Sequence, residues 1–381
     1  MSQGDDAPTT PRRVAPSTTP AAALAAFVGH VGKGGTGRHR GEVERVVGGF
    51  VDRVSDAGVD RVGDLTDRHL EAYAEYLAQR AWAREDDPGA GITGRTAHQY
   101  YALVRSFCGF LHERDALETN PATHAVATGA LPDRSVGVRE DDREQFWSAE
   151  TREAIVRWMD WRTEDALDHG WLDSARATRD RALVAVLAYS GARGAELFRD
   201  PQNERRQGIR WRHVDIDEGT LRVYGKSQEW QRTPLLNPGI DRLRAHYRRQ
   251  DPPTNEWPVF PTNHLPSLYA VVRDAESVDT EPTKETVWDL LRENDLVPPS
   301  LSTAGARTLL KDLSAESGVT EGGEPLLPHG ARRGLGDTLY DMSAELAQEV
   351  LRHQSVETTH RSYRDDDVER LRRAAEDALD R

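Results

Sequence analysis

The chain has 381 residues, of which 37% are hydrophobic and 30% charged, and 64 acidic residues against 50 basic ones give a formal net charge of −14. The longest strongly apolar run, residues 182–189, is too short to span a bilayer, and the N-terminus lacks the apolar core of a secretion signal. Cys108, the only cysteine, excludes an internal disulfide and a zinc site built from several cysteines. These features predict a globular protein of the reducing cytoplasm, long enough for two domains.

The basic residues are almost all arginines. The four lysines are Lys33, Lys226, Lys284 and Lys311. An acidic excess with so little lysine resembles the proteins of salt-loving microbes, in which hydrated carboxylates keep the surface soluble; an acidic protein from a GC-rich bacterium is the alternative. Net acidity ordinarily argues against a nucleic-acid partner. In molar salt, however, the Debye length is about 3 Å, so a distant carboxylate hardly repels a phosphate that an arginine contacts directly.

The first domain is predicted to be helical. Residues 1–19 are rich in Pro, Thr and Ser without an apolar period, which predicts a disordered N-terminus. Between residues 20 and 125 apolar side chains recur at a spacing of three to four, and Thr66 or Asp67 supplies a capping signal. The helical stretches are 43–54, 65–81 and 93–115, with Asn120-Pro121 ending the pattern. We expect a compact all-α domain, followed by a linker over 126–143.

The second domain mixes helices with a short run of strands. Residues 152–162 and 173–190 have helical periodicity, whereas 211–225 alternate around an Asp-Glu-Gly turn, which indicates a hairpin. Residues 231–236 are a candidate third strand. Further helices are expected at 237–249, 283–294, 303–316, 330–342 and 344–352, with an amphipathic tail helix over 365–381. The predicted fold class is therefore mainly α with a small antiparallel β-sheet.

Seven residues of the second domain form an ordered set of groups suited to phosphate chemistry. They are Arg193, Glu196, Lys226, His329, Arg332, His353 and Tyr363. Taken singly, each has an ordinary interpretation, because arginines and lysines are mostly solvated, histidines often cap helices and tyrosines often pack. Lys226 lies in the predicted hairpin loop, and His329 and Arg332 lie on the first turn of a predicted helix. The order and the intervals of the whole set are the signal.

The motifs around these residues resemble those of the tyrosine recombinases of the phage integrase family. SGARGAEL is similar to the family's first arginine box, YGK to the hairpin with its lysine, HGAR to the HxLR box and LRHQSVETT to the LGHxSxxTT box. The resemblance implies a SAM-like helical core-binding domain over 20–125 and an α+β catalytic domain over 144–364. The chain departs from the pattern at Ala192, Ala331 and Arg352, and Ser362 occupies the register where most members carry the tyrosine.

The resemblance implies transesterification of double-stranded DNA without a cofactor or a metal. The phenol of Tyr363 would attack phosphorus, forming a 3′-phosphotyrosyl bond and releasing a 5′-hydroxyl. Arg193 and Arg332 would clamp the phosphate oxygens, because a guanidinium binds two oxygens at once. Lys226 would protonate the leaving oxygen.

The remaining members of the set receive supporting roles from the same resemblance. His329 would accept or share the phenolic proton, His353 would donate to a phosphate oxygen, and Glu196 would hold Arg193 in place. Because two duplexes are cleaved in a recombination event, the resemblance implies a homotetramer on synapsed DNA. The tail helix over 365–381 would dock on a neighbouring protomer or pack on its own chain.

Other arginines and polar residues are weaker candidates for contact with DNA. Four of them lie on one predicted helix of the first domain, namely Arg95, His98, Gln99 and Arg105. Three more lie near the proposed chemistry and are either contacts to backbone phosphates or solvated charges, namely Arg333, Arg361 and Arg364.

Three alternative functions share part of the pattern. A relaxing topoisomerase of type IB would use the same chemistry, although the separate helical domain and the order of the boxes favour recombination. A catalytically impaired DNA-binding remnant would fit the shifted tyrosine, although all the presumed chemical groups are retained. A metal nuclease would need ligand spacing that the acidic run Asp365–Asp367 lacks.

Overall fold

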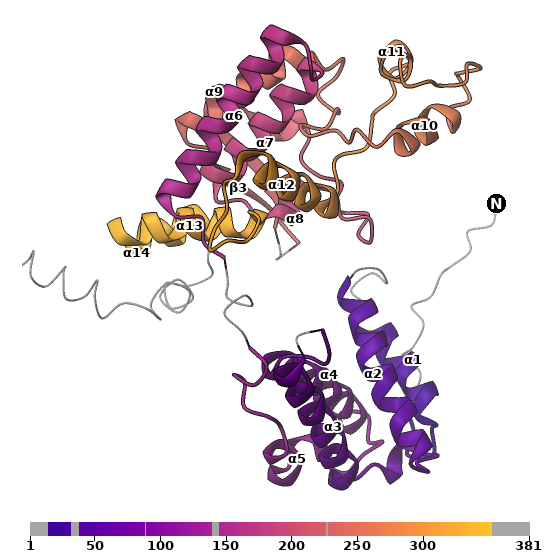
Figure 1. Ribbon diagram of the computed structural model, residues 1–381. Helices are drawn as coiled ribbons and strands as arrows, with labels where there is room; N and C mark the ends of the chain where they lie inside the picture. The colour runs from indigo at the N-terminus through magenta and orange to yellow at the C-terminus, as the bar shows by residue number, and fades with distance from the viewer. Residues whose placement is uncertain (1–13, 32–37, 88, 139–144, 226–227, 353–381) are drawn as a thin grey trace, which may run out of the picture. The chain divides into compact units, whose positions relative to one another are not determined.

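The computed structural model describes residues 14–31, 38–87, 89–138, 145–225 and 228–352 (Figure 1). The chain divides into two compact units, Met1–Arg143 and Glu144–Arg381. Each unit has its own hydrophobic core, with Phe50 and Phe107 among the buried residues of the first and Trp147 and Phe198 among those of the second. Among the described residues, no helix is long and apolar enough to cross a membrane.

The first unit is helical throughout its described residues. Its helices are α1 (Pro20–Val31), α2 (Arg38–Asp56), α3 (Asp67–Asp86), α4 (Gly94–His112) and α5 (Ala125–Gly129), with 3₁₀ turns at Val62–Asp64 and Pro121–Thr123. Phe27 of α1 packs edge-on against Phe107 and Phe110 of α4, with ring centroids 5.4 and 5.2 Å apart. The apolar side chains predicted along α4 therefore face the core, where these rings make edge-to-face contacts.

Residues 14–19 pack against this unit, although the sequence analysis places them in a disordered N-terminus. Val14 is only 3% exposed and belongs to the hydrophobic core. The backbone N–H groups of Val62 and Gly63 donate to the carbonyls of Thr18 and Pro16, both at 2.9 Å. Local composition does not predict that this segment is ordered, because its partners lie more than forty residues away along the chain.

The described part of the predicted linker, residues 126–138, also packs on the first unit. The N–H of Gly94, at the start of α4, donates to the carbonyl of Val136 at 2.7 Å. A Cβ on Gly94 would lie 2.1 Å from the carbonyl oxygen of Asp133, so the two backbones approach too closely for any other residue. His98 also donates from Nε2 to the carbonyl of Pro132, at 2.8 Å. The segment is therefore part of the domain, held by contacts that composition alone does not reveal.

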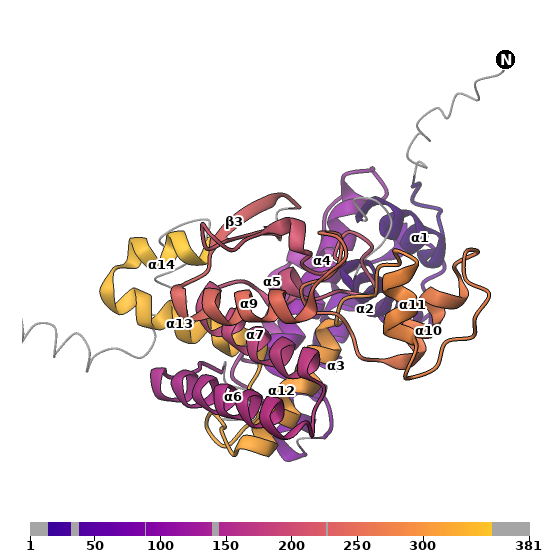
Figure 2. The same ribbon diagram turned by 90° about the horizontal axis from the view of Figure 1, so that it is seen from above.

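The second unit combines helices with one small sheet. Its helices are α6 (Ala149–His169), α7 (Ser174–Ser190), α8 (Gly194–Leu197), α9 (Asn237–Gln250), α10 (Leu265–Arg273), α11 (Val287–Glu293), α12 (Thr303–Ser317), α13 (Pro328–Met342) and α14 (Ala344–Leu351), with a 3₁₀ turn at Trp211–His213. Helix α7 is buried along most of its length because α6, α9 and α13 pack around it, and Figure 2 shows it between α6 and α9. Residues 182–189, in the C-terminal half of α7, are apolar on every face, as expected for the buried part of a helix.

The sheet contains the three strands that the sequence predicts, β1 (Val214–Asp215), β2 (Thr220–Tyr224) and β3 (Trp230–Pro234), in the order β1-β2-β3. All pairs are antiparallel, and Leu221 of β2 is aligned with Val214 on one side and Thr233 on the other. Lys226, predicted to lie in the loop of the β2–β3 hairpin, is outside the described residues.

Several helices of the second unit differ from the prediction. Helix α6 extends beyond the expected 152–162, and the short helix α8 is not predicted. The helix expected over 283–294 is shorter, Val287–Glu293, and α10 is not predicted at all. Pro266 near the start of α10 masks its apolar spacing, although proline is well tolerated in a first helical turn.

Candidate active site

The C-terminal end of α7 is where the candidate active site begins. Gly191 ends this helix in the left-handed conformation, with φ of 60°, and a Cβ there would lie 3.1 Å from the side chain of Leu351. The end of α14 therefore packs directly on the end of α7. Two residues later Arg193 precedes the short helix α8, and a Cβ on Gly194 would lie 3.2 Å from Pro328, the first residue of α13. Three elements distant in sequence thus meet at one point.

Arg332 ties these elements together. It lies on the second turn of α13 and is only 3% exposed. Its Nη1 donates to the carbonyl of Gly191, and its Nη2 donates to the carbonyl of Leu351. The guanidinium therefore bonds to the ends of both α7 and α14, which fixes its position next to the Arg193 segment.

Glu196 holds Arg193. The carboxylate of Glu196 is fully buried; its Oε1 accepts from Nη1 of Arg193 at 2.9 Å, and its Oε2 accepts from the backbone N–H of Arg193 at 2.8 Å. Burial by itself would raise the pKa of Glu196, but the charge of Arg352 and the bonds from Arg193 outweigh burial and lower it. Glu196 is therefore an ionised, buried carboxylate bonded to Arg193, while the Arg193 side chain remains 30% exposed.

His329 lies on the exposed side of the same cluster. Loss of hydration, followed by the charges of Arg333, Arg332, Arg193 and Arg307, lowers the pKa of His329 to about 4. The imidazole is therefore neutral at pH 7 and has a nitrogen lone pair that can accept a proton. A neutral base beside several guanidiniums fits a reaction in which a proton is removed next to a developing negative charge.

The first turns of α13, which include His329, are held by close packing against residues 145–147. The carbonyl of Gly330 accepts from the N–H of Trp147 at 3.0 Å, and Oε1 of Gln145 accepts from the N–H of Leu327 at 2.7 Å. A Cβ on Gly334 would lie 1.9 Å from the carbonyl oxygen of Trp147, so this helix face must be bare. Gly330 and Gly334 of PHGARRG therefore allow close contact with Trp147, and their spacing of four on a predicted helix is the sequence signal for this packing.

The structure brings together four of the seven residues predicted for the chemistry, and the other three lie outside its described residues. Arg193, Glu196, His329 and Arg332 form one cluster. Lys226, His353 and Tyr363, together with Arg361 and Arg364 and the tail over 365–381, lie outside the described part of the chain. Arg333 is half-buried, with its guanidinium carbon 5.9 Å from the centre of the Phe146 ring. In the first unit Arg95, Gln99 and Arg105 are exposed, whereas the ring of His98 bonds to the carbonyl of Pro132.

Two arginines that the sequence analysis did not place in the site also contact it. Arg206 donates to the carbonyl of Ala195 on α8 at 2.8 Å and to the carbonyl of Gly225 at 3.1 Å, which joins α8 to the base of the hairpin. Arg352 donates from Nη2 to Oε2 of Glu196 at 2.6 Å. Both contacts join residues that are not neighbours in sequence, so local periodicity does not predict the partners, although Arg352 lies within the LRHQSVETT motif.

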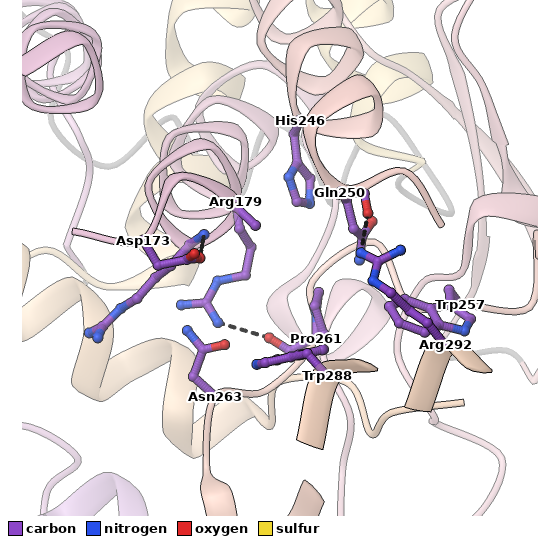
Figure 3. Close-up of a pocket in the computed structure, with 11 residues that line it drawn as sticks. Asp173, Arg179, His246, Gln250, Trp257, Pro261, Asn263, Trp288 and Arg292 are labelled. Carbon is purple, nitrogen blue, oxygen red and sulfur yellow. Dashed lines mark hydrogen bonds between the residues drawn. The ribbon is translucent and has the colours of Figure 1, made fainter. Parts of the chain in front are cut away.

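A separate cavity of about 220 Å³ lies near the opposite end of α7 (Figure 3). Arg179 is bonded there to Asp180 and to the carbonyl of Pro261, and Arg292 donates to the carbonyls of Gln250 and Asp251. Burial lowers the pKa of His246 to about 4, and its Nε2 donates to the carbonyl of Val259 at 2.7 Å. These polar groups serve the protein's own structure. Among the described residues, no cluster of three or more His, Cys, Asp or Glu side chains could hold a metal ion.

Similarity to known proteins agrees with this arrangement. Residues 157–370 match the phage integrase family. The tyrosine recombinase XerC of Xanthomonas axonopodis pv. citri is 25% identical over 55% of this chain and 56% of its own length, and XerC of Chlorobaculum parvum is 28% identical over 41% and 43%. The chain thus spans about half the length of these two relatives.

Two solved structures share the fold at low sequence identity. The Tn1549 transposon integrase in complex with a circular intermediate DNA is 11% identical, covers 95% of this chain and 100% of its own, and has a TM-score of 0.58. The XerH site-specific recombinase in a post-cleavage complex with palindromic difH substrate is 15% identical, covers 88% and 79%, and has a TM-score of 0.54. The family match extends over more than half of the chain and includes every member of the residue set described above. The chain therefore belongs to the phage integrase family.

Proposed function

We propose that the protein is a site-specific tyrosine recombinase that cleaves and rejoins double-stranded DNA through a 3′-phosphotyrosyl intermediate. The observation that carries the proposal is the cluster of Arg193, Arg332 and neutral His329. Arg193, held by Glu196 and 30% exposed, offers a preorganised donor to a non-bridging oxygen of a phosphodiester. The buried Arg332, whose Nη1 and Nη2 each donate to a backbone carbonyl, would add a second donor through its remaining N–H groups. Such donors typically contribute about 3–4 kcal/mol each to a transition state.

The proposed reaction conserves bonds and needs no oxidant or energy source. The phenolic oxygen of Tyr363 forms a bond to phosphorus while the bond from phosphorus to the 5′-oxygen breaks. His329 accepts the phenolic proton, since its lowered pKa leaves it neutral, and Lys226 supplies a proton to the departing 5′-oxygen. A 5′-hydroxyl of the partner strand then reverses the step. A bound phosphate places negative charge beside His329 and favours the imidazolium that forms.

We propose further that the first unit is the core-binding domain and contacts DNA through Arg95, Gln99 and Arg105, which are exposed along α4. His98 is a weaker candidate because its ring already bonds to Pro132. Arg333, Arg361 and Arg364 are proposed contacts to backbone phosphates. Four protomers would assemble on two duplexes in the cytoplasm, with the tail over 365–381 coupling neighbours.

The acidic surface is proposed to be a halophilic adaptation. Screening of carboxylate repulsion should then raise the melting temperature as KCl increases from about 0.1 M to about 3 M. A melting temperature that stays flat or falls over this range would contradict the adaptation without affecting the proposed chemistry.

The proposed function is tested by trapping the covalent intermediate. The probe is a pool of nicked duplexes with randomised sequence around the nick, incubated with the protein in EDTA, so that a short 5′-hydroxyl fragment diffuses away after cleavage. The wild type should give a protein–DNA conjugate, Lys226→Ala should give it slowly, and Tyr363→Phe should bind DNA without forming it. A 5′-phosphorothiolate at the scissile position should rescue Lys226→Ala, because that leaving group needs no acid. A conjugate that requires Mg²⁺ would contradict the proposal.

A further inference from the structure

Arg352 has an unusual backbone conformation for its residue type. It ends α14 with φ of 55° and ψ of 47°, in the left-handed region that a side chain with a Cβ seldom occupies. Glycine would adopt this conformation without strain, and the family pattern has glycine at this position. An arginine that accepts the strain is expected to make contacts that offset it.

The contacts of Arg352 lead directly to the arginine cluster. Its Nη2 donates to Oε2 of Glu196 at 2.6 Å, and its side chain is only 9% exposed. Glu196 is shared, because its Oε1 accepts from Arg193 at 2.9 Å. The three side chains therefore form an Arg–Glu–Arg group with one net positive charge, whereas Arg193 and Glu196 alone would be neutral. Only Arg193 in this group is substantially exposed, so the net charge faces the space open to a phosphate.

Arg352 also contacts the hairpin. Its Nη1 donates to Oε1 of Gln231 on β3 at 3.4 Å, and β3 follows the loop that includes Lys226. The preceding residue, Leu351, accepts from Arg332 through its carbonyl. Residues 351–352 thus contact both arginine elements and the hairpin strand, immediately before the segment that includes His353 and Tyr363.

We propose that Arg352 is a positioning residue of the strand-transfer reaction: it fixes Glu196, and through it Arg193, and ties this pair to β3 and to the end of α14. Arg352 does not touch the phosphate in this role. It keeps the clamp oriented and positively charged at the point where the nucleophile's segment leaves α14. This inference rests on the proposed function, because it concerns the same reaction.

The test compares Arg352→Gly with the wild type in the trapping assay. Glycine suits the backbone at this position, so the variant is expected to fold. The first-order trapping rate at saturating DNA should fall by about 10–100-fold, the usual effect of removing a group that orients a catalytic side chain. The DNA dissociation constant should change by less than about threefold, since Arg352 is bonded within the protein. Arg352→Lys should recover part of the rate, because an ammonium still reaches one carboxylate.

The chain offers a matched control and a double-mutant cycle. Asp295 is exposed and also has a left-handed backbone, with φ of 53°, so Asp295→Gly makes the same backbone change away from the site and should leave the rate unchanged. In a Glu196→Gln background, Arg352→Gly should slow trapping by less than about threefold, because the residue it acts through is already altered. Wild-type trapping rates in Arg352→Gly, or independent losses in the double variant, would overturn the proposal.

Failure of the proposed function would look different, since the wild type itself would form no conjugate. The inference would still be tested in that case, through thermal unfolding of the wild type, Arg352→Gly, Glu196→Gln and the double variant. Additive changes in stability for Arg352→Gly and Glu196→Gln would show that the two residues are not coupled, and would contradict the positioning role.

Discussion

The regions around the two ends of α7 contain the same kinds of side chain but differ in whether those side chains are accessible. At the start of the helix Asp180 lies between Arg179 and Arg176, and His246 has a pKa lowered to about 4. Beyond its end Glu196 lies between Arg193 and Arg352, and the pKa of His329 is also lowered to about 4. Residue types and pKa shifts alone therefore do not distinguish a catalytic site from a structural one.

Access is what separates the two regions. His246 is 1% exposed and its Nε2 is bonded to Val259, whereas His329 is exposed. Arg179 is 4% exposed and paired with Asp180, whereas the side chain of Arg193 is 30% exposed beside His329. The first region uses its charges to hold the fold, and the second leaves Arg193 and His329 accessible, as the proposed reaction requires. A perturbed pKa marks a candidate site only when the group can be reached.

The largest expected effect comes from replacing one arginine of each region, Arg193 and Arg179, by alanine in separate variants. Arg193→Ala should slow covalent trapping by about 10²–10³-fold, because it removes a preorganised donor to the phosphate. Arg179→Ala should instead lower the free energy of unfolding by about 3–5 kcal/mol, because it leaves Asp180 buried without its close partner. Trapping rates and denaturant unfolding measured on both variants check the contrast. Slow trapping by folded Arg179→Ala would show that the two ends are not functionally distinct.

Acid should destabilise the protein through the buried end of α7. The pKa of His246 is about 4 in the folded protein and 6.5 is its ordinary value, so the unfolded chain binds the proton more readily between these values. Stability is therefore complete above about pH 6.5 and is lost as the pH falls toward 4, by about 3 kcal/mol for this residue. His246→Gln, which keeps a donor to Val259, should flatten unfolding curves recorded between these pH values. An unchanged acid dependence in the variant would assign the loss to other groups.

Adding a methyl group to the closely packed face of α13 should have a smaller effect on stability. A glycine of α2 that has no close neighbour provides the control. Gly334→Ala places a methyl 1.9 Å from the carbonyl of Trp147, and overpacking of this kind costs about 1–3 kcal/mol. The displaced helix contains His329 and Arg332, so trapping should slow as well. Gly49→Ala on α2 meets nothing within 4 Å and should stabilise the first unit by about 0.5–1 kcal/mol, as measured by thermal unfolding. Equal stability changes in both variants would contradict the close packing described for α13.

Local sequence patterns predicted most of the elements, because apolar spacing and turn residues act over a few positions. The hairpin around Asp217-Glu218-Gly219, the central helix α7 and the start of α3 beside Thr66 are confirmed on that basis. The order of the motif residues also pointed to Arg193, Glu196, His329 and Arg332, which the structure brings together.

What the sequence could not provide are contacts between distant segments. The bonds of Arg352 to Glu196 and Gln231, and of Arg206 to Ala195 and Gly225, join residues separated by 11 to 156 positions. The packing of residues 14–19 and 126–138 depends on backbone bonds of the same long-range kind. Such contacts follow from the tertiary structure and leave no local pattern.

The central claim is that Tyr363 becomes covalently joined to DNA at the accessible end of α7. The most direct measurement is peptide mapping by mass spectrometry of the conjugate formed on the nicked duplexes, after nuclease digestion leaves a nucleotide on the protein. The account predicts that the nucleotide is attached to Tyr363 through a 3′-phosphate and that Ser362→Ala leaves the conjugate unchanged. A nucleotide attached to Ser362, or a conjugate that persists in Tyr363→Phe, would contradict it.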